Sequence, residues 1–185
     1  MVKKEKKSQG LTVFELALFA MLGAIMFCSK LLMEWIPNVH LLGMFTITFT
    51  LVYRKKALFP IYLYVLLNGV YAGFATWWIP YLYIWTILWA IAMLLPGAIS
   101  NPVKKWQYVL STAVLMTLCG LHGICFGILY APAQALMYGL SFETTVGWII
   151  TGFPFDVIHG IGNFFAGTLI IPLVKLLKLL DKKRR

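Results

Sequence analysis

Charged residues are scarce in this chain of 185 residues. Only 12% of the residues are charged and 61% are hydrophobic, and the mean hydropathy is +0.85. Ordinary soluble domains carry about 25% charged residues, so this composition excludes that class. Apolar runs of about 20 residues are long enough to cross a bilayer as helices. The sequence therefore predicts an all-α integral membrane protein.

Several catalytic signatures are also missing. The chain has no G-x-x-x-x-G-K-[ST] sequence, so we do not expect it to hydrolyse ATP itself. It also lacks H-E-x-x-H and G-x-S-x-G, the commoner signatures of metalloproteases and serine hydrolases. The cysteines are Cys28, Cys119 and Cys125, an odd number without paired ligand spacing, and they are interpreted as small buried hydrophobic residues. We expect neither an enzyme nor a metal or cofactor site.

Basic residues are numerous but unevenly placed. There are 16 Lys and Arg residues against 6 Asp and Glu, which gives a formal net charge of +10. All of them except Lys30 fall within residues 3–7, 54–56, 104–105 and 175–185. Clusters between apolar runs are typical of the cytoplasmic side of a membrane protein, and they argue against a nucleic-acid partner.

Six apolar runs lie between these clusters and predict six transmembrane helices. The runs cover residues 11–34, 39–53, 57–76, 79–97, 106–129 and 154–175. Each basic cluster follows an even number of crossings, so we expect both termini in the cytoplasm. The predicted parts are a basic tail over 1–10, a six-helix membrane domain over 11–180 and a basic tail over 181–185.

The longest outward connection is expected over residues 130–153. Pro132 and Gln134 indicate a loop, and Ser141 is a candidate N-cap for a short helix. The sequence leaves open whether this helix joins the sixth span. Pro154 is expected in the first turn of that span.

Three polar side chains share one face of the last apolar run. At about 100° per residue, Asp156, His159 and Asn163 fall within about 60° of one another, and Gly152 and Gly167 lie near the same stripe. Polar groups at membrane depth are costly unless they face a protein-lined cavity, so the stripe predicts a substrate site. A structural role stays open, because an acid can complement a helix dipole and amides or imidazoles can join helices.

The outward connections contribute further candidate residues. Lys30 and Glu34 are four residues apart and can form an ion pair. We expect both in the substrate site. Aromatic rings can stack on a flat ligand, although they also anchor proteins at the headgroup level. The aromatic candidates for the site are Trp35, Trp77, Trp78 and Tyr81.

These residues also predict the kind of ligand. Several aromatic planes with a few hydrogen-bonding groups suit a flat heterocycle better than a long anion. We expect a neutral or cationic heteroaromatic molecule, with Asp156 or Glu34 as its counter-charge and Asn163 binding a ring edge.

Small residues predict two close helix contacts. Ala17, Ala20 and Ala24 line one stripe of the first run, and Gly123 and Gly127 are four apart in the fifth. Small side chains let another helix approach closely, either within the molecule or from a partner.

The alanine spacing and the final polar motif resemble a known family. Ala20 and Ala24 form an A-x-x-x-A stripe, and residues 155–163 read F-D-x-x-H-x-x-G-N. With six short spans, these motifs are similar to the substrate-binding S components of energy-coupling factor transporters. The resemblance implies a high-affinity vitamin-capture subunit in the cell membrane. Its implied partners are a transmembrane T component and two cytoplasmic ATPases of the ABC type.

The resemblance also implies roles for individual residues. The stripe of Ala17, Ala20 and Ala24 would dock the T component. The polar stripe of 156, 159 and 163 would line the substrate pocket, with the outward turns near Trp35 and Trp77 as gates. The resemblance does not identify the vitamin.

Two other classes of function stay open. A membrane enzyme could use Asp156 and His159 as acid and base. A self-contained carrier or channel would transport its substrate without partners or ATP.

Overall fold

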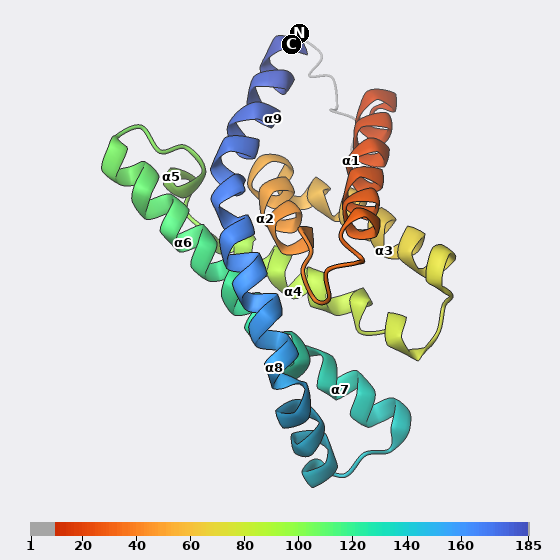
Figure 1. The fold of residues 1–185 in the computed structure, drawn as a ribbon. Coiled ribbons are helices and arrows are strands. Elements are labelled where there is room, and N and C mark those ends of the chain that lie inside the picture. The colour runs from red at the N-terminus through yellow and green to blue at the C-terminus, as the bar shows by residue number, and fades with distance from the viewer. Residues whose placement is uncertain (1–9, 185) are drawn as a thin grey trace, which may run out of the picture.

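The computed structural model describes residues 10–184, and helices are the only regular elements in this range (Figure 1). The α-helices are α1 (Val13–Leu32), α2 (Leu42–Tyr53), α3 (Leu58–Ala72), α4 (Tyr81–Leu94), α5 (Gly97–Ser100), α6 (Lys105–Ile124), α7 (Phe126–Tyr138), α8 (Phe142–Ala166) and α9 (Ile170–Arg184). Three short 3-10 helices connect them: Arg54–Ala57, Thr76–Trp78 and Gly167–Leu169. The predicted all-α class is confirmed for these residues.

In the described part of the chain, four helical segments are long and apolar enough to cross a membrane. They are Val13–Leu32, Thr76–Leu94, Lys105–Tyr138 and Phe142–Lys182. Helices α2 and α3 have 12 and 15 residues, fewer than the roughly 20 that a straight crossing needs. Membrane-type helices are therefore present as expected, whereas the number of six crossings stays a prediction.

Helix α1 begins at a capping box that also joins it to a distant segment. Thr12 Oγ1 accepts a hydrogen bond from the backbone N–H of Glu15, and the Glu15 carboxylate accepts the N–H of Thr12. The same carboxylate accepts a hydrogen bond from Lys56 Nζ at 2.6 Å. The start of α1 thus lies beside the connection between α2 and α3. We call this side of the molecule the basic end.

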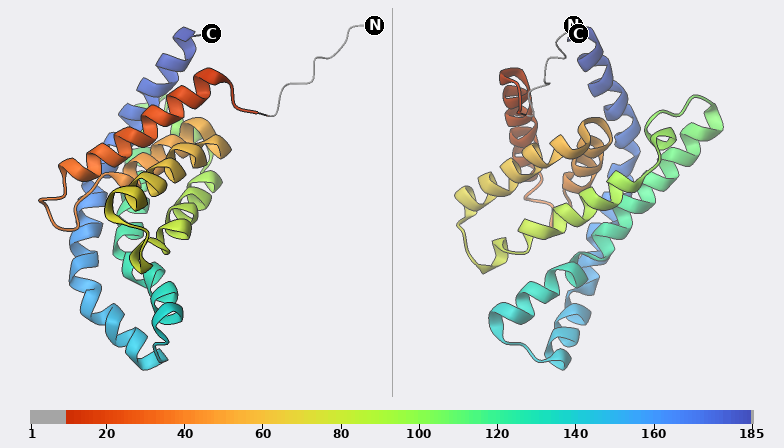
Figure 2. Two further views of the ribbon diagram at one scale, coloured as in Figure 1. Left: turned by 90° about the vertical axis from the view of Figure 1, so that its right-hand side faces the viewer. Right: turned by 180° about the vertical axis from the view of Figure 1, so that it is seen from behind.

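Two further contacts bring other helix ends to the basic end. The Arg54 guanidinium donates to the carbonyl of Met93 at 2.7 Å, and Lys178 Nζ donates to Asn101 Oδ1 at 2.8 Å. The end of α4, the α5–α6 connection and the last turns of α9 are therefore held here. All views place the start of α1 and the end of α9 on this side (Figures 1 and 2).

The opposite side of the molecule is a hairpin of α7 and the first half of α8, which we call the hairpin end (Figure 2). The Tyr130 hydroxyl donates to the carbonyl of Trp77 at 2.6 Å. The Tyr83 hydroxyl donates to the carbonyl of Leu129 at 2.6 Å. These bonds fasten α7 to the connection between α3 and α4 and to the first turn of α4.

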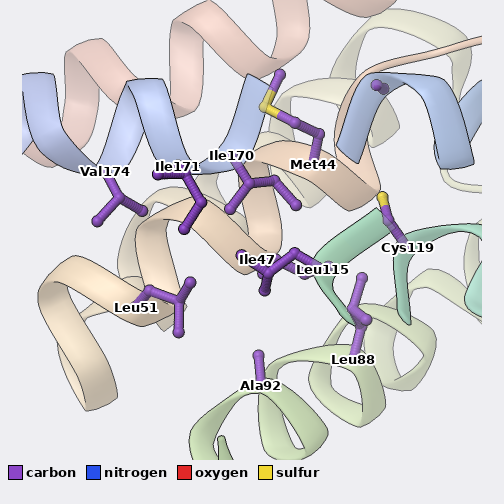
Figure 3. Packing of buried hydrophobic residues seen from close by; sticks show 11 residues of the cluster. Met44, Ile47, Leu51, Leu88, Ala92, Leu115, Cys119, Ile170, Ile171 and Val174 are labelled. Carbon is purple, nitrogen blue, oxygen red and sulfur yellow. The ribbon is translucent and has the colours of Figure 1, made fainter. Parts of the chain in front are cut away.

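The interior contains two clusters of buried apolar side chains. One lies between α2, α4, α6 and α9, whose side chains point toward one another in Figure 3. Its members include Met44, Ile47, Leu51, Leu88, Ala92, Leu115, Cys119, Ile170, Ile171 and Val174. The other cluster joins α1 to α2, α3 and α4, and it includes Phe19, Met26, Ile61, Tyr64 and Trp85.

Glycines form the contact between α6 and α8. A Cβ atom added at Gly123 would lie 2.8 Å from the Cα of Gly160, closer than two nonbonded carbon atoms can approach. A Cβ atom added at Gly127 would collide with the carboxylate of Asp156. The predicted close contact is confirmed at Gly123, which faces the backbone of α8, and Gly127 in α7 makes room for the Asp156 side chain instead.

The prediction that residues 130–153 form a loop is wrong, because most of them lie in the helices α7 and α8. Helix α7 continues through Pro132 to Tyr138, and Gly139 then turns the chain with a left-handed backbone (φ 61°). Ser141 is the predicted N-cap, since its side chain accepts the N–H of Thr144, but its helix runs on without a break. Pro154 therefore lies inside α8 rather than in a first turn. Proline within apolar helices is tolerated where neighbouring groups satisfy the freed carbonyl.

Cys28 is exposed, although the sequence analysis expected all three cysteines to be buried. Cys119 is buried as expected and Cys125 is partly buried, but Cys28 is exposed on α1. The helix turns Phe19, Leu22 and Met26 toward α3, which leaves the face of Cys28 outside the core. Exposure is compatible with its apolar sequence context, because a bilayer replaces water around such a surface.

Candidate functional site

A cavity of about 230 Å³ lies between the segment that joins α1 to α2 and the helices α4, α7 and α8. Among the predicted site residues, it is lined by Lys30, Glu34, Tyr81, Asp156 and His159. The rest of its wall comes from Met33, Ile36, Pro37, Asn38, Val39, His40 and Phe126. Five predicted residues from α1, the α1–α2 connection, α4 and α8 therefore meet at one cavity.

The acidic group of the cavity is anchored by a neighbouring helix. Both oxygens of the Asp156 carboxylate lie 3.1 Å from the backbone nitrogen of Gly127 and accept its N–H. Gly127 is in the first turn of α7, where backbone N–H groups have no partner within their own helix. Asp156 thus complements the start of α7, and its side chain is only 7% exposed.

The histidine of the stripe faces the same cavity. His159 is 4% exposed, and its Nε2 atom is buried without a hydrogen-bond partner in the described chain. Its ring packs edge-on against His40, with centroids 4.4 Å apart, and against Phe126 at 4.8 Å. An unpaired buried nitrogen costs about 1–3 kcal/mol, so His159 is a polar group that the fold leaves unsatisfied beside the cavity.

The two charged residues from the end of α1 form a weak pair. Lys30 Nζ lies 3.8 Å from Glu34 Oε1, and the Glu34 side chain is 55% exposed. Exposed pairs of this kind contribute about 0–1 kcal/mol. The ammonium group of Lys30 is therefore nearly free to bind an anionic group in the cavity.

Seven residues of the wall were not among the predicted site residues, and two of them, His40 and Phe126, carry aromatic rings. The His40 ring also contacts Trp85, with centroids 6.0 Å apart, and Phe126 contacts Trp85 at the same separation. The only signal for His40 is an imidazole in an otherwise apolar turn, and nothing local distinguishes Phe126 from the other phenylalanines.

Asn163 does not line this cavity. Its side-chain amide donates to the carbonyl of His159 at 3.0 Å, and its Oδ1 lies 3.7 Å from the Cys119 thiol, which donates to it. A Cβ atom added at Gly43 would lie 2.7 Å from Asn163 Oδ1. The amide is 1% exposed and packs α8 against α2 and α6. The expectation that it binds a ring edge therefore has no geometric support.

The three tryptophans also lie away from the cavity wall. Trp35 is 80% exposed. Trp78 donates its indole N–H to the carbonyl of Val65 at 2.8 Å, which fastens the 76–78 segment to α3. Trp77 packs edge-on against Tyr81, with centroids 5.7 Å apart. Of the four aromatic candidates, Tyr81 alone lines the cavity, and Trp77 reaches it through Tyr81.

The alanine stripe lies on the outer surface of α1. Ala17 and Ala20 are exposed and Ala24 is partly buried, whereas Gly23 packs against Leu63 of α3. Packing within the molecule therefore uses the glycine and leaves the first two alanines uncovered.

The chain was compared with protein-family models, curated proteins and solved structures, and none of them matches. Within residues 10–184 no group of three or more His, Cys, Asp or Glu side chains is placed to hold a metal ion. The arrangement that remains is a small cavity with an anchored carboxylate, a buried imidazole and an amine. Such a cavity can bind and orient a small polar molecule.

Proposed function

We propose that this chain is the substrate-capture subunit of an energy-coupling factor importer in a bacterial or archaeal plasma membrane. It binds a heteroaromatic vitamin or vitamin precursor from outside the cell. A T component and two cytoplasmic ATPases then drive its delivery inward. This division of labour agrees with the lack of a nucleotide-binding motif in the chain.

The observation that carries the proposal is the cavity with Asp156 and His159 on its wall. Ionisable residues in membrane helices are rare and usually mark a substrate or ion pathway. Here they meet Tyr81 and Phe126, so the cavity offers both aromatic surfaces and hydrogen-bonding groups to one small molecule.

The distribution of basic residues supports an outward-facing cavity. Lys56 and Lys178 are held at the basic end, which the positive-inside rule assigns to the cytoplasm. Helix α1 spans 20 residues, about 30 Å, with Glu15 in its first turn at that end and Lys30 in its last turn at the cavity. In this proposal both termini are cytoplasmic and the cavity opens toward the outside.

The alanine stripe supports docking of a partner. Ala17 and Ala20 are exposed on an apolar helix, where a second membrane helix can approach the backbone closely. The T component is the proposed occupant of this stripe.

The proposal is tested by binding and uptake in one system. The full chain is purified in detergent, and its co-purifying small molecules are identified by mass spectrometry. The same molecules are then offered to liposomes that contain the chain alone, or the chain with a T component and two ATPases. We expect binding in both cases and ATP-dependent uptake only with the partners.

Each alternative class has its own signature in this experiment. Uptake by the chain alone, without ATP, identifies a self-contained carrier or channel. Chemical turnover of the molecule by the chain alone identifies an enzyme. Within residues 10–184 no hydrogen bond joins Asp156 to His159, so the structure offers no preformed acid–base pair for that case.

A further inference from the structure

We infer that the cavity selects a small zwitterion, with Asp156 binding the positive group and Lys30 binding the negative group. This inference rests on the proposed substrate-binding role of the cavity and specifies the ligand further. It differs from the neutral or cationic ligand that the sequence alone suggested, because the structure places Lys30 on the same cavity wall as Asp156.

Asp156 requires a positive or hydrogen-donating partner. The residue is 7% exposed, and within residues 10–184 its carboxylate accepts hydrogen bonds from one backbone N–H, that of Gly127. The described part of the chain pairs no Lys, Arg or His with it within 4 Å. A buried carboxylate with one donor keeps unused acceptor sites, which an amine or protonated ring nitrogen of a ligand can fill.

Lys30 provides the opposite charge from another element. It comes from the last turn of α1, whereas Asp156 comes from α8, so the two charges approach the cavity from separate helices. Its pair with Glu34 has a separation of 3.8 Å, and Glu34 is mostly exposed to solvent. A ligand carboxylate inside the cavity therefore competes for Lys30 against a weakly bound partner.

The size and the remaining wall limit the rest of the ligand. A volume of about 230 Å³ is below the roughly 300 Å³ at which drug-sized pockets begin, so the ligand has one ring or two small ones. Phe126 and Tyr81 provide aromatic contacts for that ring. His159 is one more polar side chain on this wall.

The test measures how the purified full chain, in lipid nanodiscs, discriminates between charge forms of the same ring. The probes are phenylalanine, tyrosine and aminomethylbenzoic acid. Each is offered as the zwitterion, the cationic amide, the anionic N-acetyl form and the neutral doubly capped form. Affinity is measured by calorimetry and by the shift in unfolding temperature. We expect at least one zwitterion to bind about 10- to 100-fold more tightly than its own amide and N-acetyl forms.

Matched variants assign each charge to its residue. Lys30→Gln should abolish the preference for the zwitterion over the amide, whereas Lys105→Gln, at the exposed start of α6, should retain it. Asp156→Asn should abolish the preference for the zwitterion over the N-acetyl form. Glu34→Gln should leave both preferences in place, because Glu34 competes with the ligand for Lys30.

Three results would overturn the inference. They are equal binding of amide and zwitterion by the unmodified chain, a preference that survives Lys30→Gln, and no binding of any probe form. These results are separate from a failure of the proposed importer role. Binding needs no partner protein. Zwitterion binding without ATP-dependent uptake would therefore reject the proposed importer role but not the selection of a zwitterion. ATP-dependent uptake of a purely cationic molecule would reject the selection of a zwitterion but not the importer role.

Discussion

The carboxylate of Asp156 in α8 accepts the backbone N–H of Gly127 through both of its oxygens, each at 3.1 Å. This contact gives one residue two roles. It satisfies an N–H group in the first turn of α7, and it places a negative charge on the cavity wall. A substitution can separate the two roles, because an amide oxygen still accepts a hydrogen bond but carries no charge.

We predict that Asp156→Asn retains the fold and weakens binding of the native ligand, whereas Asp156→Ala impairs both. The alanine variant leaves the Gly127 N–H buried and unpaired, which destabilises the folded state by about 1–3 kcal/mol. Unfolding in detergent and calorimetric binding of the co-purified molecule measure the two effects. Equal unfolding midpoints for the two variants would contradict the anchoring role.

Gly127→Ala is the complementary variant. Its added methyl group would occupy the position of the Asp156 carboxylate, so the acid must move away from the α7 backbone. Ligand binding should then fall although the acid itself is present. Unchanged affinity would show that the ligand does not depend on where α7 holds the carboxylate.

The stripe of Asp156, His159 and Asn163 could be predicted from the sequence, because residues three and four apart share a helix face. Local periodicity does not tell how deep each member lies. Asn163 lies one turn after His159 in α8, where it packs against Cys119 and Gly43. It therefore serves helix packing, whereas Asp156 and His159 line the cavity.

The partners of the stripe could not be predicted, since they come from distant parts of the chain. Gly127 was recognised as a small residue for helix packing, and its N–H was not expected to meet Asp156.

The hairpin of α7 and α8 was not predicted, for a different reason. Pro132 and the polar residues after Ser141 are typical of loops in water, but an apolar surrounding favours a continuous helix, in which backbone groups pair internally.

We predict that the glycine contact between α6 and α8 is required for stability. Gly123→Leu forces a side chain against the backbone of Gly160, and overpacking of this kind destabilises proteins by about 1–3 kcal/mol or more. Gly147→Leu is the control, because a Cβ atom there meets nothing within 4 Å. Unfolding midpoints in one detergent compare the two, and a midpoint for Gly123→Leu at or above that of the control would contradict the contact.

We predict that Ala20→Leu prevents assembly with the T component and leaves ligand affinity within a few-fold. Ala20 is exposed, so the larger side chain disturbs no internal packing but blocks a close approach from outside. Ala90→Leu, at an exposed alanine of α4, is the matched control and should assemble normally. Co-purification and ATP-dependent uptake measure the outcome. Normal uptake by Ala20→Leu would remove the docking role from the stripe.

The last prediction concerns the number of crossings. Helices α2 and α3 are short, yet their connection reaches the basic end, where Lys56 binds Glu15 and Arg54 binds the carbonyl of Met93. If the start of α1 is cytoplasmic, this connection must be cytoplasmic too, and the chain between Lys30 and Arg54 crosses the membrane. Six crossings are then expected, although within residues 10–184 only four segments are long and apolar enough to be recognised by length and composition.

Single cysteines in a background without Cys28, Cys119 and Cys125 can test this topology. The positions are Lys55→Cys at the basic end and Glu143→Cys at the exposed start of α8. A maleimide that cannot cross membranes is added to intact cells, and labelling is compared with that after permeabilisation. We expect Glu143→Cys to react in intact cells and Lys55→Cys to react only after permeabilisation. Reaction of both in intact cells would place the α2–α3 connection outside and reduce the crossings below six. Reaction of Lys55→Cys alone would invert the whole arrangement and turn the cavity toward the cytoplasm.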